Sequence, residues 1–193
     1  WRPFVDVRVP IYWEFLVPLA DKIDAITAPR GLKLPREYYQ PLPDHLPCLS
    51  HCCKTPGFDL YGFYYRDTIH TNSFTMENPW LDEAAQLDPY SYTIAINTEV
   101  GRNKGLHDGE LIWVENERGR KVKGRVKLMQ GIHPEGLGIG ACAGHWGDGM
   151  PVAKGKGVFF NELLELDWKH ASPINFNLDL CARVKVTPAM VSQ

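Results

Sequence analysis

The chain has 193 residues, of which 44% are hydrophobic and 23% are charged, so it can bury a core and is not a disordered chain. The 21 Lys and Arg residues against 23 Asp and Glu give a formal charge of −2, which offers no electrostatic case for a nucleic-acid or acidic-membrane partner. The best apolar stretch, Ile11 to Ala20, contains Glu14 and Pro18 and is much shorter than the roughly 20 residues of a membrane span.

The N-terminal part predicts one helix and a long connector. From Ile11 to Ile26 apolar residues recur every three or four positions, which predicts a helix that Pro18 would kink or split. From Ala28 to Pro56 six prolines interrupt every candidate element. So long a connector is unusual inside one domain. We therefore expect residues 1–57 to be an interdomain connector with the end of a preceding domain, and residues 58–193 to be a separate domain.

The first residue is Trp1 and no signal-peptide pattern follows, so we expect a piece of a longer protein. Within the connector, Cys48, His51, Cys52 and Cys53 carry thiols and an imidazole, the ligands that zinc prefers. Neighbouring cysteines cannot easily both reach one tetrahedral ion, and no second ligand pair lies nearby. A loop with buried or idle thiols is the favoured interpretation, and a zinc site is the alternative.

After Gly57 the hydrophobic period changes to two, which is typical of strands. Strands are predicted over Phe58–Tyr65, Tyr92–Asn97, Glu110–Glu115, Lys121–Leu128 and Leu180–Val186. Asn78 and Pro79 are typical of the first positions of a helix, here one over 80–87. A second short helix is expected from Thr98 to about Lys104, ended by Gly105. Residues 116–119 then form a four-residue hairpin connection.

Three basic or glycine-rich segments resemble phosphate-binding elements. Lys121, Lys123, Arg125 and Lys127 alternate with small or apolar residues, which indicates a solvated strand face. Gly136–Gly140 and Lys154–Gly157 lack the spacing and context of dinucleotide or P-loop motifs. We interpret both as glycine-rich turns.

The remaining histidines and cysteines offer no catalytic pattern. His51, His107, His133 and His170 are expected at the surface, Asp108 in a turn, and Cys142 and Cys181 as small core residues. No Ser-His-Asp or paired-carboxylate arrangement can be argued from the spacing. The sequence therefore predicts no catalytic residue and no metal ligand.

A series of motifs in a fixed order carries a family resemblance. An aromatic strand runs into Arg66 and a polar string, and the later motifs follow in this order: His70-Thr71-Asn72-Ser73-Phe74-Thr75, Asn78-Pro79-Trp80-Leu81, Asp108-Gly109, Glu117-Arg118-Gly119, His145-Trp146-Gly147, Asn161 and Cys181-Ala182-Arg183-Val184-Lys185. Over about residues 57–187 the chain resembles the C-terminal molybdopterin-dinucleotide-binding domain of the DMSO-reductase family of molybdenum and tungsten oxidoreductases.

The resemblance implies a fold and a role. The fold would be mainly β with small helices, a six-stranded double-psi β-barrel like that of aspartate decarboxylase, preceded by an irregular Pro-rich segment. The barrel would hold one pyranopterin guanine dinucleotide of a Mo/W bis-dinucleotide cofactor. Upstream domains of the same polypeptide would carry the metal ligand and the substrate site, and an iron–sulfur electron-transfer subunit is a further implied partner.

The resemblance also implies which residues contact the cofactor. A pyranopterin dinucleotide offers many donors and acceptors and therefore needs a polar pocket on a rigid frame. The implied contacts are Arg66, His70, Thr71, Asn72, Ser73 and Thr75, joined by His145, Trp146, Asn161 and Asn175. Asn72 stands where the family usually has Gly, and Asn tolerates the left-handed backbone.

The chain alone is not expected to be a complete catalyst. It shows no C-x₂-C-x₃-C pattern that could hold an iron–sulfur cluster. Two other classes of function stay open at this point. One is a stand-alone accessory or interaction barrel, and the other is a small metal-binding protein that uses the Cys48 to Cys53 cluster.

Overall fold

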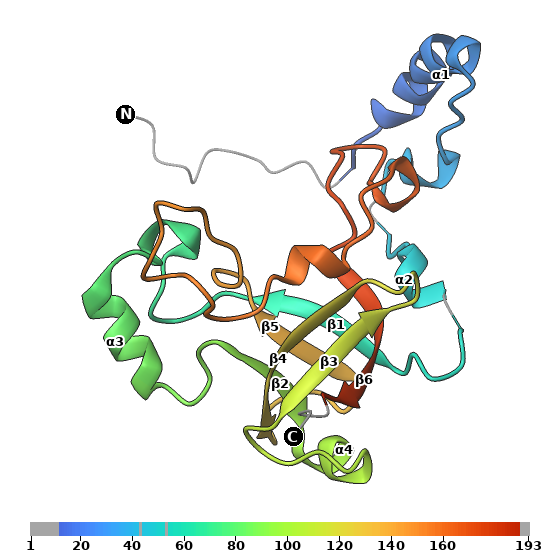
Figure 1. Cartoon of the computed structure of the whole chain (residues 1–193). Coiled ribbons are helices and arrows are strands. Elements are labelled where there is room, and N and C mark those ends of the chain that lie inside the picture. The colour runs from blue at the N-terminus through green and yellow to red at the C-terminus, as the bar shows by residue number, and fades with distance from the viewer. Residues whose placement is uncertain (1–11, 43, 53, 190–193) are drawn as a thin grey trace. The chain divides into compact units, whose positions relative to one another are not determined.

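The computed structural model describes residues 12–42, 44–52 and 54–189. The chain groups into two compact units. One unit comprises Trp1–Cys48 with Leu166–Leu178, and the other comprises Leu49–Glu165 with Asp179–Gln193. The second unit contains the six strands of the described chain (Figure 1). The boundary at residue 57 between a connector and a barrel domain stays a prediction.

The six strands form a closed barrel. They are β1 (Leu60–Tyr65), β2 (Thr93–Asn97), β3 (Leu111–Asn116), β4 (Lys121–Met129), β5 (Gly136–Gly140) and β6 (Cys181–Pro188). Around the barrel they follow the order β1-β5-β2-β4-β3-β6, and β6 pairs with β1. The pairs β1·β5 and β2·β4 are parallel, and the other four are antiparallel. Each described strand thus has a partner on both sides, and the mainly β class is confirmed.

The barrel interior is filled by aliphatic side chains from every strand, because alternate residues of a strand point to the same side. The fully buried members of this core include Leu60, Ile94, Ile96, Ile112, Val114, Val126, Leu137, Ile139 and Val184. Phe160, Leu163 and Leu164, from the segment that follows the loop after β5, complete the same cluster. The barrel is therefore a packed core.

The basic side chains of β4 confirm the prediction of a solvated strand face. Val122 and Val126 are buried, whereas the basic residues between them are exposed. Each basic side chain has a partner within the barrel unit: Lys121 pairs with Glu115 at 3.1 Å, Lys123 lies over the ring of Trp113, Arg125 donates to the Gly109 carbonyl and Lys127 pairs with Asp108 at 2.7 Å. These contacts within the protein account for the alternating basic residues of β4, so a phosphate ligand is not needed to explain them.

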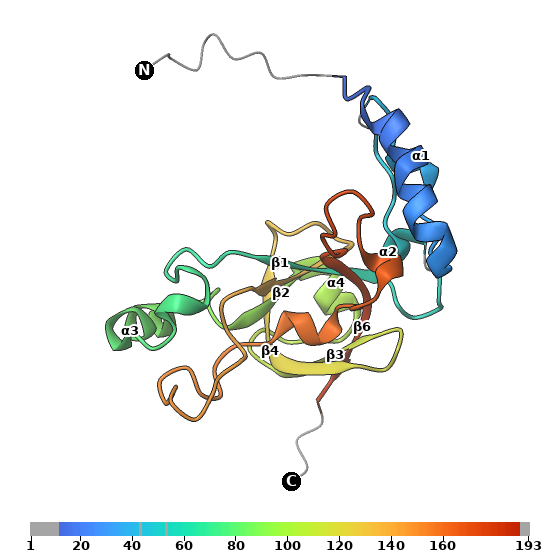
Figure 2. The same ribbon diagram turned by 90° about the horizontal axis from the view of Figure 1, so that it is seen from above.

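The predicted short helices form with the predicted caps. Helix α3 (Pro79–Leu87) begins where the Asn78 side chain accepts hydrogen bonds from the backbone N–H groups of Trp80 and Leu81, at 3.0 and 3.2 Å. Helix α4 (Thr98–Asn103) ends before Gly105, which has a positive φ of 73°. Figures 1 and 2 show α3 and α4 on different sides of the barrel. Local capping residues were sufficient to place both helices.

One predicted glycine-rich turn is a strand. The segment Gly136–Gly140 forms β5, so its interpretation as a turn was wrong. A Cβ on Gly136 would lie 3.1 Å from the Phe63 ring, and one on Gly138 would lie 3.2 Å from the Tyr65 ring. The glycines therefore let two aromatic rings of β1 pack closely against β5. In contrast, Lys154–Gly157 is a turn, as expected.

The described residues of the first unit form α1 (Leu16–Thr27) and three 3₁₀ turns, Ala28–Arg30, Arg36–Tyr38 and Trp168–His170. The kink expected at Pro18 is wrong, because Pro18 lies in the first helical turn, where a missing N–H breaks no helical hydrogen bond. The turns Ala28–Arg30 and Arg36–Tyr38 interrupt the connector, from Ala28 to Pro56, that was predicted to have no regular element.

A small core holds the first unit together. Leu16 and Ala20 of α1 pack with Tyr39, which is buried. The Tyr39 hydroxyl donates to the Pro173 carbonyl at 3.2 Å, so residues 134 positions apart in the chain are joined. The segment 166–178 is therefore part of this unit, although it is distant from α1 in the sequence.

Gly124 tests the packing of the barrel core. A Cβ there would overlap Val158 and approach the Ile94 side chain to 2.9 Å. Gly124→Ala is expected to lower the free energy of unfolding by about 1–3 kcal/mol, the usual range for overpacking. Gly140→Ala is the matched control, since its Cβ would meet no atom within 4 Å. Urea unfolding measures both, and equal stability of the two variants would contradict this packing.

Candidate functional site

The parallel pairing of β1 and β5 brings two loops to one end of the barrel. Tyr65 and Gly140 are register partners at the last residues of the two strands. The Ala141 N–H donates to the Tyr65 carbonyl at 2.9 Å. Because parallel neighbours end at the same edge of a sheet, the polar loop that begins at Arg66 starts beside the loop that begins at Ala141.

A second core cluster holds the two loops together. Its buried members are Met76, Cys142, Ala143 and Ala153, with Tyr92 and Met150 packed against them. The Glu77 carboxylate accepts hydrogen bonds from the Val152 and Ala153 N–H groups, at 3.2 and 2.7 Å. Burial raises the pKa of the Cys142 thiol, and its core position agrees with the prediction. The sequence-predicted site residues of both loops therefore share one rigid base.

His70 is the centre of a hydrogen-bond chain inside the polar loop. The Thr75 hydroxyl accepts from the Thr71 N–H at 2.9 Å, so its own proton can go to His70 Nδ1, 3.2 Å away. His70 Nε2 then carries the ring proton and donates to the Tyr92 hydroxyl at 2.8 Å. The Tyr92 hydroxyl donates to Asp82 at 3.1 Å. His70 is 4% exposed, so its ring nitrogens are used within the protein.

The hydrogen-bond chain from His70 ends at the buried carboxylate of Asp82. Burial by itself raises the pKa of Asp82, but the hydrogen bonds from Lys156, Tyr92 and Gln86 outweigh burial and lower the pKa overall. Burial and the bond to Asp82 raise the pKa of the Tyr92 hydroxyl. Tyr92 has a positive φ of 61°, which is unusual for a bulky residue and is kept only where the surroundings fix it. Sequence spacing offered no signal for Asp82, Tyr92 or Lys156.

The side chains of the polar loop form two sets, an inner one and an outer one. His70 and Thr75 face inward, and their hydrogen bonds hold the loop. Arg66, Thr71 and Asn72 are exposed, and Ser73 is half-buried. Asn72 has a positive φ of 51°, which is the left-handed turn expected of a residue in place of Gly. The outer set is the part of the loop that can donate to a ligand.

His145 and Trp146 lie on the second loop. The His145 ring packs 5.1 Å from the Phe159 ring, and its buried Nδ1 atom has no hydrogen-bond partner among the described residues. Trp146 is 46% exposed and lines a pocket of about 390 Å³. Lys123 and Gly155 line the same pocket. A cation, an aromatic ring and glycine backbone thus meet there.

Asn161 and Asn175 lie in different parts of the structure. Asn161 is exposed in the 3₁₀ turn Phe160–Leu163 and lines a pocket of about 280 Å³ with Tyr64 and Ala141, at the ends of β1 and β5. Asn175 belongs to the other compact unit, where its side chain accepts from the Asn177 N–H at 3.0 Å. The structure therefore brings Asn161 to the barrel end and gives Asn175 a local turn contact.

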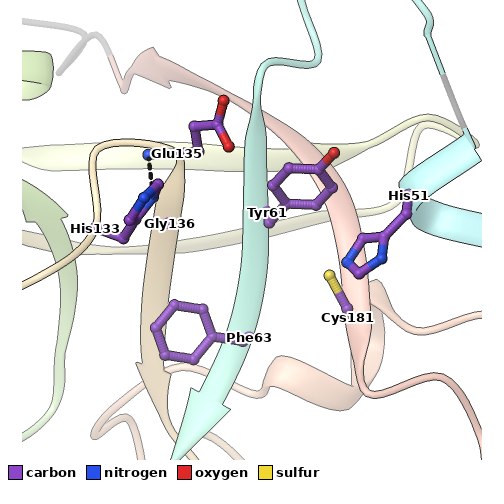
Figure 3. A pocket seen from close by; sticks show the side chains of 7 residues that line it. All are labelled: His51, Tyr61, Phe63, His133, Glu135, Gly136 and Cys181. Atoms are coloured by element: carbon purple, nitrogen blue, oxygen red, sulfur yellow. Dashed lines mark hydrogen bonds between the residues drawn. The ribbon is translucent and has the colours of Figure 1, made fainter. Parts of the chain in front are cut away.

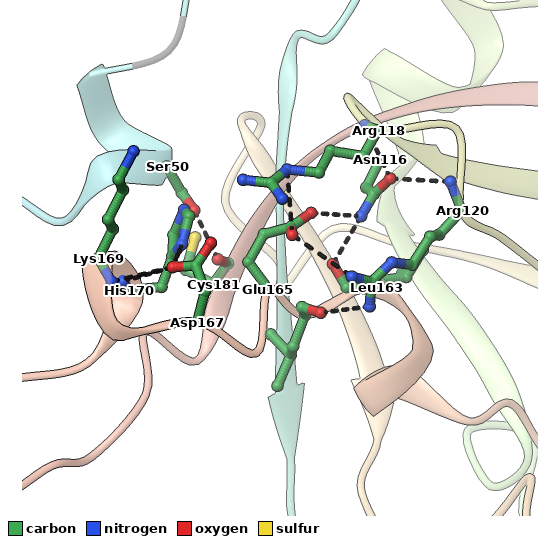
Figure 4. Close-up of polar contacts among 11 residues, drawn as sticks. Ser50, Asn116, Arg118, Arg120, Leu163, Glu165, Asp167, Lys169, His170 and Cys181 are labelled. Atoms are coloured by element: carbon green, nitrogen blue, oxygen red, sulfur yellow. Dashed lines mark hydrogen bonds and ion pairs between the residues drawn. The ribbon is translucent and has the colours of Figure 1, made fainter.

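A buried amide fixes the segment that carries Asn161 (Figure 4). Asn116, 2% exposed, donates to the Leu163 carbonyl at 3.0 Å and to Glu165 at 3.2 Å. Its oxygen accepts from the Arg118 and Arg120 N–H groups, at 3.0 and 2.9 Å. The arginine side chains also pair with Glu165. We call these contacts the Asn116 clamp. They join the predicted hairpin turn at residues 116–119 to the segment that carries Asn161.

A separate pocket of about 500 Å³ lies on the outer wall of the barrel (Figure 3). His51, His133 and Cys181 line it together with Tyr61 and three neighbouring residues. Cys181 is half-buried and is not the core residue that was predicted. Its neighbour Ala182 points inward, and alternation along β6 turns Cys181 outward.

The other two histidines differ from each other. The His107 side chain is 86% exposed, as predicted. His170 is not a surface residue, because its side chain is 12% exposed and contacts Asp167 at 2.7 Å. Asp108 performs the expected turn role: its carboxylate accepts from the Leu128 N–H at 2.7 Å, and the ion pair with Lys127 together with this bond lowers its pKa.

The donor set fits a polyanionic, aromatic cofactor better than a bare metal ion. Within the described residues, no group of three or more His, Cys, Asp or Glu side chains is arranged to hold a metal. Cys53 of the predicted cysteine cluster lies outside the described residues. At the barrel end, the exposed Arg66 guanidinium, the buried His145 Nδ1 and the exposed Trp146 ring offer charge, hydrogen bonds and stacking.

Comparison with known proteins gives distant relatives. No protein-family model matches the chain. It is 29% identical over 115 residues to a sulfite dehydrogenase subunit from Allochromatium vinosum, and the match covers 57% of this chain and 11% of that protein. Acetylene hydratase from Pelobacter acetylenicus has a similar fold, with a TM-score of 0.62 and 18% identity, covering 86% of this chain and 23% of that chain. The chain thus spans about a tenth of one relative and a quarter of the other.

The helices are short or polar. None of those in the described part of the chain is long and apolar enough to cross a membrane.

Asn116 tests the clamp. Asn116→Ala removes an amide whose loss leaves two backbone N–H groups and a buried carbonyl without partners, and it is expected to lower the free energy of unfolding by about 2–3 kcal/mol. Asn103→Ala is the control, because Asn103 is exposed at the end of α4. Urea unfolding measures both variants. A loss for Asn116→Ala no larger than for the control would contradict the clamp.

The lowered pKa of Asp82 predicts that the stability of the fold depends on pH. A carboxyl with a lowered pKa in the folded state stabilises the fold above its unfolded pKa, and this contribution disappears as the pH falls through the folded value. The stability difference between the wild type and Asp82→Asn is therefore expected to be constant from about pH 7 to about pH 5 and to shrink below about pH 4. Thermal unfolding across this range measures it. Glu83→Gln, on the exposed side of α3, should show no such change.

Proposed function

We propose that the chain is the C-terminal cofactor-binding domain of a molybdopterin oxidoreductase. In this proposal it holds one pyranopterin guanine dinucleotide of a Mo/W bis-dinucleotide cofactor. The observation that carries the proposal is the joining of the Arg66 loop and the His145 loop at one end of the barrel by the parallel pair β1·β5. Both loops were singled out by the family resemblance, and they are far apart in the chain.

The comparisons support this proposal at a coarser level. One relative belongs to a sulfite dehydrogenase, which is an oxidoreductase. The fold similarity covers most of this chain but a quarter of the acetylene hydratase chain. These proportions agree with a domain of a larger enzyme whose substrate site and metal ligand come from upstream domains. Because that relative is named as a subunit, we also propose a multi-subunit enzyme. The partner that the family resemblance implies is an iron–sulfur electron-transfer subunit.

We also propose the double-psi class for the barrel. Two parallel pairs, β1·β5 and β2·β4, are joined by the antiparallel pair β2·β5. Each parallel pair needs a long crossover, and here the β1-to-β5 connection contains β2, β3 and β4. This interlocked strand order supports the proposed class.

Named residues would hold the dinucleotide. Arg66 and the Thr71 and Asn72 region would donate to phosphate oxygens, since an exposed guanidinium and a tight turn suit an anion. His145 would use its buried Nδ1, and Trp146 would offer a ring for stacking. Ser73 and Asn161 would complete the polar lining. His70 and Thr75 would position the loop without contacting the ligand.

The chain's own residues would bind and orient the cofactor. The bound metal would supply the redox or oxygen-transfer chemistry. In this proposal the His70 imidazole and the Thr75 hydroxyl serve to hold the polar loop, because both take part in the hydrogen-bond chain that ends at Asp82. The protein's contribution would be a rigid frame, because the hydrogen bonds from His70 to Asp82 hold the polar loop and the Asn116 contacts hold the segment that carries Asn161.

A ligand titration tests the proposal. The chain is titrated anaerobically with guanosine diphosphate and with pyranopterin guanine dinucleotide released from a molybdenum enzyme, and backbone amide shifts are followed by NMR. Shifts are expected in residues 66–75 and 141–149. Arg66→Ala is expected to weaken binding about tenfold or more, as loss of a charge-assisted phosphate contact does.

A control variant distinguishes binding at this site from unspecific electrostatic attraction of the anionic ligand. Arg102→Ala removes an exposed arginine on α4, away from the two loops, and should leave the affinity unchanged. Shifts centred on α4, or no shift with either ligand, would overturn the proposed site. Equal weakening by Arg102→Ala would mean that binding is unspecific.

A further inference from the structure

Three separate segments of the barrel unit line the pocket beside Trp146. They are the start of β4, the loop after β5 and the 3₁₀ turn Phe160–Leu163 with the residues just before it. The first segment contributes Lys123, the second contributes Trp146 and the third contributes Glu162. The volume of about 390 Å³ is in the range of small-molecule sites. A cation, an aromatic ring and a carboxylate therefore border one cavity.

Glycine backbone forms a rigid part of the pocket lining. The Gly144 N–H donates to the Lys156 carbonyl at 2.9 Å, which joins the loop after β5 to the turn that precedes Val158. Gly144 has a positive φ of 91°, and a Cβ there would overlap the backbone of Val158 and Phe159. No larger residue fits at this position without moving the backbone. A lining of close-packed backbone suits a flat ring, because no side chain stands out from it at Gly144.

The two charged groups of the pocket have unused hydrogen-bonding capacity. The Glu162 carboxylate is exposed and has no ion-pair or hydrogen-bond partner among the described residues. The Lys123 ammonium lies over the Trp113 ring, 5.5 Å from the centroid, and pairs with no carboxylate in the described part of the chain. A cation–π contact leaves N–H donors of the ammonium available. By comparison, Lys121 on the same face of β4 pairs with Glu115 at 3.1 Å.

The Asn116 clamp positions the backbone that carries Glu162. The last carbonyl of the turn Phe160–Leu163 accepts from the Asn116 amide at 3.0 Å, and the Leu164 N–H donates to the Asn161 carbonyl at 3.2 Å. The first and last residues of this turn are buried in the barrel core, whereas Asn161 and Glu162 between them are exposed. The Glu162 carboxylate therefore extends outward from a fixed backbone.

The Trp146 ring is available for stacking. It is 46% exposed and makes no ring contact with another described residue. The preceding residue, His145, packs on the Phe159 ring with centroids 5.1 Å apart. Phe159 lines the same pocket. The backbone next to Trp146 is thus held at the pocket, while the indole face stays open to a ligand.

We propose that this pocket binds the guanine base of the dinucleotide, with Glu162 and Lys123 as the residues that select guanine over other bases. The inference rests on the proposed function, which supplies the nucleotide. Guanine presents two neighbouring donors, N1–H and the 2-amino group, beside the O6 acceptor. The Glu162 carboxylate accepts from the two donors, the Lys123 ammonium donates to O6, and the Trp146 ring stacks on the purine.

The same two charged groups disfavour the other purines. Adenine has an amino group where guanine has O6, and an N1 lone pair where guanine has N1–H, so it brings a donor to Lys123 and an acceptor to Glu162. Hypoxanthine keeps O6 and N1–H but lacks the 2-amino group. A site built to hydrogen-bond a polar group rejects an analogue without that group, because its own polar atoms are left unpaired. We therefore expect the affinity to fall from guanosine to inosine to adenosine diphosphate.

Titrations with the three nucleoside diphosphates test the base site. The full chain is used, and binding is followed by NMR at the Trp146 indole N–H signal, which Trp146→Phe assigns. Guanosine diphosphate is expected to bind about tenfold more tightly than adenosine diphosphate. Glu162→Gln should remove most of this preference by weakening the binding of guanosine diphosphate alone. Glu99→Gln, an exposed carboxylate on α4, is the control and should keep the preference.

Lys123→Met tests the contact with O6. It is expected to weaken guanosine and inosine diphosphate by the same factor, about fivefold or more, because both bases carry O6 and a charge-assisted hydrogen bond is lost. Adenosine diphosphate should be affected less. Lys121→Met is the matched control, since it removes the same charge from the same face of β4 but does not line the pocket. Thermal unfolding checks that each variant is folded, and the wild-type preference decides if one is not.

The outcomes distinguish this inference from the proposed function. Equal affinity for guanosine and adenosine diphosphate, or a preference that survives Glu162→Gln, overturns the base site. If the pyranopterin dinucleotide still shifts residues 66–75 in that case, the proposed function stands. If the dinucleotide does not bind but a guanine preference that depends on Glu162 is measured, the proposed function fails and the base site is supported. No binding of any of these ligands overturns both.

Discussion

The parallel pairing of β1 with β5 is the constraint on which the described functional region depends. It joins two strands that are far apart in the chain and ends both at the same edge, with Tyr65 opposite Gly140. The glycines of β5 make the pairing compact, because they leave room for the Phe63 and Tyr65 rings. Without this pair the polar loop after β1 and the His145 loop after β5 would have no common base. The connection between the two strands contains β2, β3 and β4.

The polar loop shows how one segment can serve both stability and binding. His70 and Thr75 use their side chains within the chain of hydrogen bonds that ends at Asp82. Arg66 and Asn72 stay exposed. A loop that must present donors to a charged ligand loses less conformational entropy on binding when it is already ordered. The buried part of the loop therefore supports the exposed part, and the left-handed Tyr92 is retained because His70 and Asp82 both hold its hydroxyl.

The two faces of the same strands have different chemistry. Toward the core, β1 and β6 contribute aliphatic residues, and outward they contribute Tyr61, Cys181 and Arg183. Alternation along a strand separates these faces. As a result, the barrel wall presents side chains that the proposed dinucleotide site at the barrel end does not use.

Local signals in the sequence determined the helix cap at Asn78, the hairpin at residues 116–119, the alternation of β4 and the exposed turn at Asn72, because each depends on neighbours within a few positions. The motif order was also sufficient to single out the two loops. Only the tertiary structure decided that Gly136–Gly140 is a strand, since its partners are aromatic rings on a distant strand. It also turned His70 and Thr75 inward and Cys181 outward, because burial and register depend on pairing across the barrel. Asn175 belongs with the other compact unit for the same reason: contacts between distant segments, and not spacing along the chain, assign a residue to its surroundings.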